Sequence, residues 1–102
     1  MAIAEIDVHE LAGAGGTAVV VDVRELDEWR SGHIVDAVHV PLATVPERLD
    51  AFDGSPTYVV CRSGRRSAAA CEFASAQGHD VANVAGGMLA WQAAGFDVVT
   101  GA

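Results

Sequence analysis

The chain has 102 residues, of which 51% are hydrophobic and 20% are charged, and its formal net charge is −8. This length fits one domain with a single core, so we expect residues 1–102 to form one unit. The balance of apolar and charged residues is typical of a globular protein and excludes a disordered one. The negative charge repels nucleic acids and anionic membrane surfaces, so neither is expected as a partner.

No apolar stretch approaches the ~20 residues that a membrane-spanning helix needs. The N-terminal segment MAIAEIDVHEL carries acids where a signal peptide would carry bases, so a cytoplasmic location is expected. Two cysteines in that compartment should be reduced thiols rather than a disulfide. They are too few for a cysteine-based zinc site, and the four histidines show no metal-binding spacing. We therefore expect neither a metal nor another cofactor.

The N-terminal half of the chain alternates short apolar runs with helical patterns. Residues 2–6 are a weak strand pattern, and residues 8–14 indicate a short helix that ends at a group of glycines. Residues 18–23, AVVVDV, form the continuous β-branched run that is typical of a strand buried on both faces. Residues 25–31 follow as a short helix with acids in its first turn, and residues 37–40 are a third strand.

The C-terminal half continues the same alternation. Residues 45–52 predict a helix with Pro46 at its start. Residues 57–61, TYVVC, are a fourth strand, and residues 65–78 predict the longest helix of the chain. A fifth strand, DVANV, and a last helix that ends at Gly95 complete the pattern.

This alternation predicts an α/β fold, with a five-stranded parallel sheet, right-handed crossovers and helices on both faces. In such sheets, ligands bind outside the carboxyl ends of the strands. Cys61 lies at the carboxyl end of the fourth predicted strand, directly before a helix. It is therefore expected at the functional edge of the sheet.

The segment CRSGRRS, residues 61–67, holds half of the six basic residues of an acidic chain. Its backbone N–H groups can point inward, and the following helix adds the positive end of its dipole. A cysteine in such a cradle should have a pKa below the ~8.5 of a free thiol. Gly64 permits unusual backbone angles, and Ser67 offers a hydroxyl near the helix start. An inert buried cysteine would need none of these features, whereas sulfur transfer and phosphoryl transfer would both use them.

Three motifs in succession resemble the rhodanese (thiosulfate:cyanide sulfurtransferase) domains. They are VVDVRELDEWRSGHIVDAVHVPL at residues 20–42, CRSGRRS at residues 61–67, and VANVAGGMLAWQAAGFDVV at residues 81–99. The resemblance implies the single-domain version of a rhodanese-like fold and a ping-pong transfer of sulfur. The Cys61 thiolate would take the outer sulfur of thiosulfate, release sulfite and hold a persulfide until cyanide or a thiol acceptor removes it.

The resemblance also assigns roles to the residues of the loop and to its neighbours. Cys61 would be the nucleophile, and the backbone amides of the loop would hold the charge of the persulfide. Arg65 and Arg66 would contact the sulfonate oxygens of the donor, while Arg62 more often turns outward in such loops. The full set expected to bind substrate is Arg62, Ser63, Gly64, Arg65, Arg66 and Ser67. Asp22 and Arg24 would brace the site, whereas His33 and Trp91 would be structural, and Cys71 is expected to be a small buried residue.

Two departures and two alternatives accompany the resemblance. Asp36 stands where the family commonly has glycine, and Arg65 where uncharged residues are common. Phosphatases of the same fold place an arginine after five intervening residues, a position that Ser67 fills here, because Arg66 comes one residue earlier. This spacing disfavours a phosphatase or arsenate reductase. A persulfide carrier that serves a partner enzyme would leave the same pattern, and the oligomeric state stays open.

Overall fold

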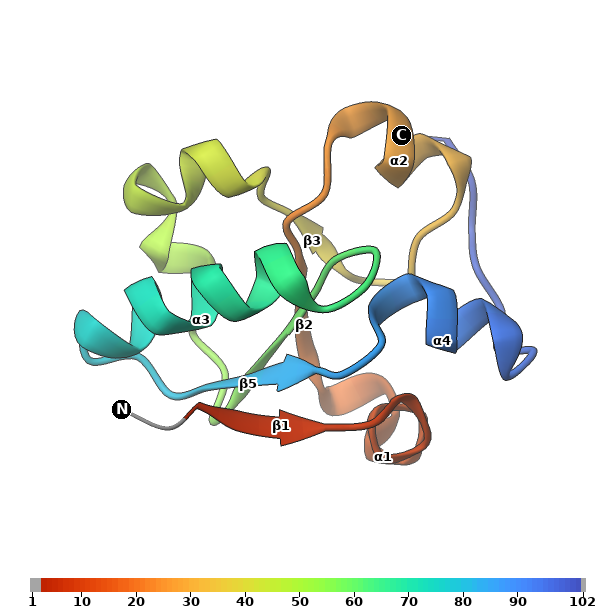
Figure 1. Ribbon diagram of the computed structural model, residues 1–102, viewed down its shortest axis with the longest axis horizontal. Coiled ribbons are helices and arrows are strands. Elements are labelled where there is room, and N and C mark those ends of the chain that lie inside the picture. The colour runs from red at the N-terminus through yellow and green to blue at the C-terminus, as the bar shows by residue number, and fades with distance from the viewer. Residues whose placement is uncertain (1–2, 102) are drawn as a thin grey trace.

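The centre of the protein is a parallel β-sheet. In the computed structural model, which describes residues 3–101, five strands lie in the order β1-β5-β4-β2-β3 (Figure 1). Every neighbouring pair is parallel, as the alternation of strands and helices predicts. The strands are β1 (Ala4–Ile6), β2 (Val19–Asp22), β3 (Val38–His39), β4 (Thr57–Val60) and β5 (Val81–Val84).

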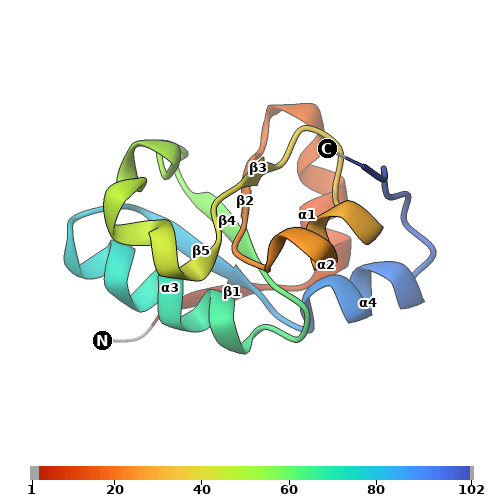
Figure 2. The ribbon, with the colours of Figure 1, turned by 90° about the horizontal axis from the view of Figure 1, so that it is seen from above.

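Helices cover both faces of this sheet, which confirms the predicted class of fold (Figures 1 and 2). They are α1 (Val8–Ala14), α2 (Leu26–Ser31), α3 (Arg65–Ala76) and α4 (Gly87–Ala93). The helices α1 and α4 pack together on one face, and α3 packs on β4 and β5 from the other. No helix within residues 3–101 is long and apolar enough to cross a membrane.

The core is divided by the sheet into two layers. Val20 belongs to the layer beneath α1 and α4, together with Leu11 and Trp91. Its neighbour Val21 belongs to the layer beneath α3, together with Cys71. Because successive side chains of a strand point to opposite faces, a strand that is covered on both sides must be apolar throughout. This explains the continuous valine run of β2.

The prediction of a helix over residues 45–52 is wrong. The structure has two 3₁₀ segments there, η2 (Leu42–Glu47) and η3 (Leu49–Ala51). Pro46 lies inside η2, where it has no N–H to donate and where its ring would clash with the carbonyl four residues earlier in an α-helix. Hydrogen bonds that span three residues replace the four-residue bonds of an α-helix. For example, the N–H of Arg48 donates to the carbonyl of Val45 at 3.0 Å.

The other predicted elements are confirmed within one or two residues at their ends. The longest helix ends at Ala76 and the last one at Ala93, each slightly earlier than the glycine that follows it. The first strand begins at Ala4, and residue 2 of its predicted range lies outside the described residues. Asp36 has a φ of 66°, so it occupies the left-handed region that a glycine would adopt without strain.

Candidate active site

Cys61 lies at the ends of two neighbouring strands, β2 and β4, whose connections run to opposite sides of the sheet. The chain leaves β2 towards β3 on one side and leaves β4 towards β5 on the other. The carboxyl ends of β2 and β4 therefore flank a topological switch point, which is where open α/β sheets bind their ligands. Asp22 ends β2, and Cys61 directly follows β4. The fold thus brings together two segments that are far apart in the sequence.

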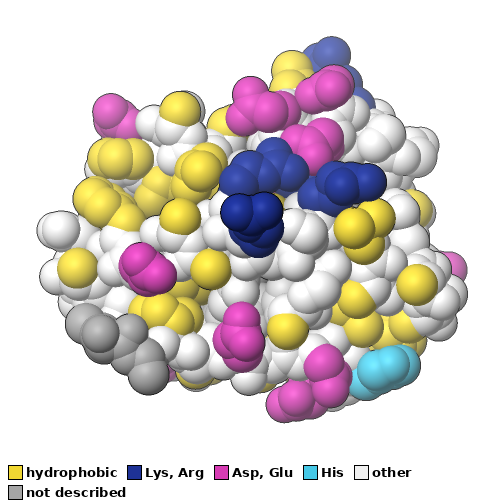
Figure 3. All heavy atoms as spheres, in the orientation of Figure 1, with side chains coloured by type: hydrophobic (Ala, Val, Ile, Leu, Met, Phe, Trp, Pro, Cys, Tyr) yellow, Lys and Arg dark blue, Asp and Glu magenta, His cyan; other side chains and the backbone are white. Residues whose placement is uncertain are grey.

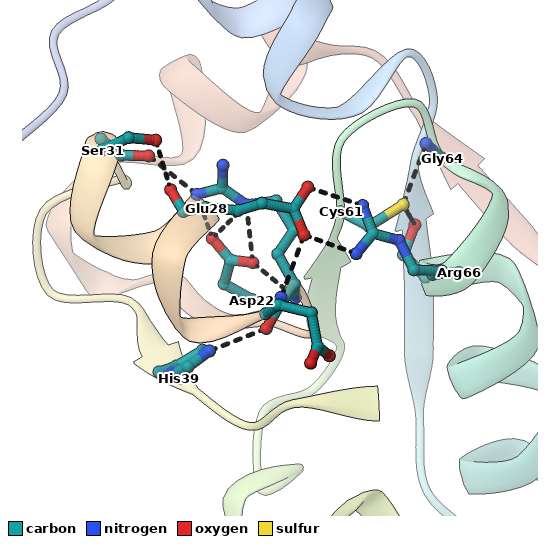
Figure 4. Close-up of polar contacts among 11 residues, drawn as sticks. Asp22, Glu28, Ser31, His39, Cys61, Gly64 and Arg66 are labelled. Atoms are coloured by element: carbon teal, nitrogen blue, oxygen red, sulfur yellow. Dashed lines mark hydrogen bonds and ion pairs between the residues drawn. The ribbon is translucent and has the colours of Figure 1, made fainter. Parts of the chain in front are cut away.

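The loop after β4 forms a cradle around the sulfur of Cys61 (Figure 4). Gly64 reverses the chain with a φ of 101°, and its N–H donates a hydrogen bond to Sγ at 3.1 Å. The hydroxyl of Ser67, on the first turn of α3, lies 3.3 Å from the same sulfur. Cys61 is only 1% exposed, so the sulfur is the floor of the cradle and not a surface thiol.

The surroundings of Cys61 favour its thiolate. Burial by itself raises the pKa of this thiol, because it penalises the charged form. Hydrogen bonds from the Ser67 hydroxyl and from the amides of Ser67, Gly64 and Ser63 outweigh that penalty, and the net pKa lies below the ordinary value. Such a thiolate is the reactive form of cysteine.

The first turn of α4 holds the start of the loop in place. The N–H of Met88 donates to the carbonyl of Cys61 at 2.8 Å, and the N–H of Leu89 donates to the carbonyl of Arg62 at 3.0 Å. A Cβ atom on Gly87 would overlap both of those carbonyl groups. The second glycine of the GGMLAW motif is therefore required by the close approach of α4 to the loop.

The three arginines of the loop do not have the same surroundings. Arg62 and Arg65 are exposed. Arg66 forms a bidentate ion pair with Glu28 of α2, with N–O distances of 2.7 and 2.9 Å (Figure 4). The hydrogen bond from Arg66 lowers the pKa of Glu28 to about 2. Arginine side chains gather in the middle of the face shown in Figure 3, next to a group of acidic ones.

Asp22 and Arg24 form a buried pair beneath α2. Nε and Nη2 of Arg24 donate to the carboxylate of Asp22 at 3.0 and 2.8 Å, and Nη2 also donates to the carbonyl of Gly32 at 2.7 Å. His39 contacts the carbonyl of Arg24 through Nε2 at 2.8 Å. These contacts hold together the two ends of the segment that carries Glu28.

His33 and Trp91 contribute to the framework around the site. The ring of His33 stacks on Trp29 with a centroid separation of 3.5 Å, and its Nδ1 lies 2.8 Å from the carbonyl of Trp29. Trp91 is buried in the layer beneath α1 and α4, and its indole N–H donates to the carbonyl of Asp97. Both side chains therefore have structural partners.

One residue of the site, Asn83, was not anticipated from the sequence. Asn83, in the middle of β5, accepts a hydrogen bond from Ser67 at an O–O distance of 2.6 Å. Its amide nitrogen donates to Gly64 and to Glu5 of β1, each at 3.0 Å. The signal was present, because Asn83 is the one polar residue of the strand VANV. A polar side chain that is 2% exposed needs partners, and here two of the three partners, Ser67 and Gly64, belong to the segment that surrounds Cys61.

A groove of about 160 Å³ lies beside the loop, between α2 and α4. It is lined by Arg24, Glu28, Ser31, Arg62, Met88, Leu89 and Gln92. A second cavity of about 190 Å³, beside α1, has a mostly apolar lining that includes no residue of the loop. Within residues 3–101, no group of three or more His, Cys, Asp or Glu side chains could hold a metal ion.

Known proteins resemble this chain over most of its length. The model of the Rhodanese-like domain family matches residues 6–94. The chain is 42% identical over 74 residues to a Bacillus subtilis protein named "Putative sulfurtransferase YtwF", and the match covers 72% of each chain. It is 37% identical to the thiosulfate sulfurtransferase GlpE of Pseudomonas savastanoi, over 74% of each chain.

The structural comparison agrees with the sequence comparison. The crystal structure of a rhodanese-like domain protein from Staphylococcus aureus superposes with a TM-score of 0.86 at 33% identity. That superposition covers 98% of this chain and all of the other. The chain therefore belongs to the rhodanese-like domain family, whose relatives include sulfurtransferases.

Proposed function

We propose that the protein is a thiosulfate sulfurtransferase that carries sulfur on Cys61. The observation that carries this proposal is the cradle itself, in which a buried thiol is surrounded by inward N–H groups and a hydroxyl at the start of α3. Such donors favour a negative charge on sulfur, both before and after sulfur is taken up. The name of the Pseudomonas relative, a thiosulfate sulfurtransferase, supports thiosulfate as the donor.

In the first half-reaction, the Cys61 thiolate attacks the outer sulfur of thiosulfate. A bond forms between Sγ and that sulfur, the S–S bond of thiosulfate breaks, and its electron pair leaves with sulfite. The negative charge then lies on the terminal sulfur of the persulfide, where the amides of Ser63, Gly64 and Ser67 stabilise it. No oxidant or reductant is consumed.

Arginine side chains at the rim receive the anionic donor. Arg65 is exposed, and Arg66 uses one hydrogen of each terminal nitrogen in its pair with Glu28. The remaining N–H groups of Arg66 are available to the sulfonate oxygens. Arg62 borders the groove beside the loop and completes the cationic rim.

In the second half-reaction, a nucleophilic acceptor removes the sulfur. A thiolate acceptor attacks the terminal sulfur, a new persulfide forms on the acceptor, and Cys61 leaves as the thiolate. Cyanide removes the same sulfur as thiocyanate. A protein thiol could also be the acceptor, and in that case the domain would be a persulfide carrier for a partner enzyme in the cytoplasm.

A phosphatase or arsenate reductase has less support. The loop places Arg66 one residue earlier than those enzymes place their arginine, so the cradle is shorter. A phosphate or arsenate must enter the cradle as a whole tetrahedral group, whereas thiosulfate brings only its outer sulfur to Cys61 and keeps its sulfonate at the rim. The geometry of this loop favours a single sulfur atom.

Mass spectrometry of the intact protein after treatment with thiosulfate tests the proposal. We expect a gain of one sulfur atom on wild-type protein and on Cys71→Ala, none on Cys61→Ser, and loss of the added sulfur with cyanide. Release of sulfite should match the sulfur gained. If folded wild-type protein gained no sulfur, or if Cys61→Ser still did, the proposed reaction would be wrong. Slow release to small thiols combined with fast release to a protein thiol would favour the carrier.

A further inference from the structure

Three side chains form a hydrogen-bonded chain that begins at the reactive sulfur and ends on the neighbouring strand β5. Sγ of Cys61 lies 3.3 Å from Oγ of Ser67, which lies 2.6 Å from Oδ1 of Asn83. Ser67 is fully buried and Asn83 is 2% exposed, so water does not replace these partners. Nδ2 of Asn83 has two acceptors, Glu5 and the carbonyl of Gly64.

The orientation of the Asn83 amide follows from its partners. Only the nitrogen can donate to a carboxylate and to a backbone carbonyl, so the oxygen must face Ser67. That oxygen can only accept a hydrogen bond. The short distance of 2.6 Å therefore requires the hydrogen of the Ser67 hydroxyl to point at Asn83.

A serine hydroxyl has one hydrogen, and two acceptors surround the hydroxyl of Ser67. We propose that Asn83 is a positioning residue, which competes with the Cys61 thiolate for the single hydrogen of Ser67. In the thiol form, the S–H group donates to Oγ, and the hydroxyl donates to Asn83. In the thiolate form, the hydroxyl must turn towards Sγ, and the buried oxygen of Asn83 loses its hydrogen bond.

This competition affects the proposed reaction cycle in a definite way. When Sγ becomes the inner atom of a persulfide, its negative charge moves to the terminal sulfur, and the hydroxyl can return to Asn83. When the sulfur is delivered, the charge returns to Sγ, and the hydroxyl must turn again. Asn83 thus favours the thiol and the loaded persulfide over the free thiolate. This consequence rests on the proposed function, whereas the competition itself does not.

Other charged and titratable groups also surround the sulfur and must be held constant in a test. Arg66 of α3, paired with Glu28 of α2, interacts electrostatically with Cys61 from one side. Cys71 of α3 also interacts with it electrostatically, and Glu5 of β1 lies behind Asn83. Two substitutions leave all of these groups in place, Ser67→Ala and Asn83→Leu. Gly64 keeps a second partner in Asn83→Leu, because its carbonyl also accepts the N–H of Ala68 at 3.3 Å.

The competition predicts shifts of opposite sign in the pKa of Cys61. Ser67→Ala removes the donor to the thiolate, so the pKa should rise. Asn83→Leu removes the competitor, so the pKa should fall by about one unit, the equivalent of one ordinary hydrogen bond. Asn83→Asp keeps an acceptor, adds a negative charge and loses the two N–H donors, so the pKa should rise. The measurement is the pH dependence of alkylation of Cys61 by iodoacetamide, with thermal unfolding as a check that each variant is folded.

A purely structural Asn83 would give a different result. Loosening of the loop would move the pKa towards that of a free thiol in Asn83→Leu and Asn83→Asp alike, so a rise in Asn83→Leu would overturn the proposal. In the Ser67→Ala background, Asn83→Leu should leave the pKa of Cys61 unchanged. If Asn83→Leu lowered that pKa as much in this background as in the wild type, the proposal would also be overturned. If Asn83→Leu does not fold, Asn83→Ala should show the same fall in pKa. Alkylation needs no sulfur donor, so this test stands even if thiosulfate is not the substrate.

Discussion

The two cysteines show how far the chemistry of one residue type depends on its surroundings. Cys61 and Cys71 are equally inaccessible, at 1% and 0% exposure. Hydrogen bonds to Cys61 overcome its burial and lower its pKa, whereas burial, without such donors, raises the pKa of Cys71 to about 12. Both are free thiols, as expected, and Cys71 packs in the core layer beneath α3. Hydrogen-bond donors to the sulfur, and not a difference in burial, therefore distinguish the two thiols.

We expect iodoacetamide to modify Cys61 and spare Cys71 in native protein at neutral pH. As the pH falls, the rate should stay high until it passes the lowered pKa of Cys61, because the thiolate is the reacting form. Peptide mapping after a pH series checks both points, with unfolded protein as the control in which the two cysteines react alike. Modification of Cys71 at a comparable rate in folded protein would contradict this assignment.

At the residue scale, the sequence predicts Cys61 as the nucleophile but not the side chains that surround it. Cys61 could be predicted because local features carry the signal: a strand end, a glycine turn and a helix start within seven residues. A single polar residue in the strand VANV signals that Asn83 needs partners, but those partners could not be predicted, because they depend on the register that places β5 beside β4 and on the approach of α3. The ion pair of Glu28 could not be predicted either, since nothing local indicates that its partner is 38 residues away.

At the scale of elements, the ion pair between Glu28 and Arg66 connects α2 to the first turn of α3. The two helices are joined to different strands, and this pair lies across the loop that contains Cys61 (Figure 4). Glu28 also accepts the N–H of Glu25 at 3.1 Å, so the same carboxylate caps α2. One side chain thus caps the start of α2 and also ties α2 to the helix that follows the Cys61 loop.

Glu28→Gln should lower the free energy of unfolding at pH 7 and have little effect near pH 2. The pKa of Glu28 is about 2 in the folded protein against 4.5 ordinarily, so its contribution is present above pH 4.5 and is lost as the pH falls towards 2. Because both side chains are partly exposed, the loss should be about 1 kcal/mol or less. Urea unfolding of wild type and variant at pH 7 and pH 3 measures it, with exposed Glu47→Gln as the control. An equal difference at both pH values would exclude the ion pair as its cause.

The elements also show where prediction from sequence ends. Strands and helices with a regular apolar pattern could be predicted, because that pattern shows which of their faces are buried in the two core layers. The helix predicted over residues 45–52 is wrong because proline at the start of a helix and proline inside a 3₁₀ segment look alike in sequence. The difference depends on how Val45 and Phe52 of this segment pack into the core.

At the scale of the whole molecule, the loop that contains Cys61 is a cationic site on an anionic protein. The net charge of −8 repels a dianion such as thiosulfate at long range. The acidic side chains next to the arginines in Figure 3 add to that repulsion. Glu28 is an exception because Arg66 neutralises it. The exposed Arg62 and Arg65 are thus the charges of the loop with no ion-pair partner among the described residues.

We predict that Arg65→Ala slows the loading of sulfur from thiosulfate more than its delivery to a neutral thiol. Arg65 is exposed, so solvent screens its charge, and the expected slowing is roughly two- to fivefold. Added salt should slow loading of the wild type and narrow its difference from the variant, because the Debye length falls from ~10 Å at 0.1 M to ~3 Å at 1 M. Stopped-flow measurement of both half-reactions at two ionic strengths makes the comparison.

The matched control is Arg30→Ala, which changes the net charge equally but lies two residues beyond Glu28, on the opposite side of α2. If Arg30→Ala slowed loading as much as Arg65→Ala does, the overall charge of the protein would govern the approach of the donor. If Arg65→Ala slowed loading and delivery equally, Arg65 would stabilise the loop and not recruit the donor.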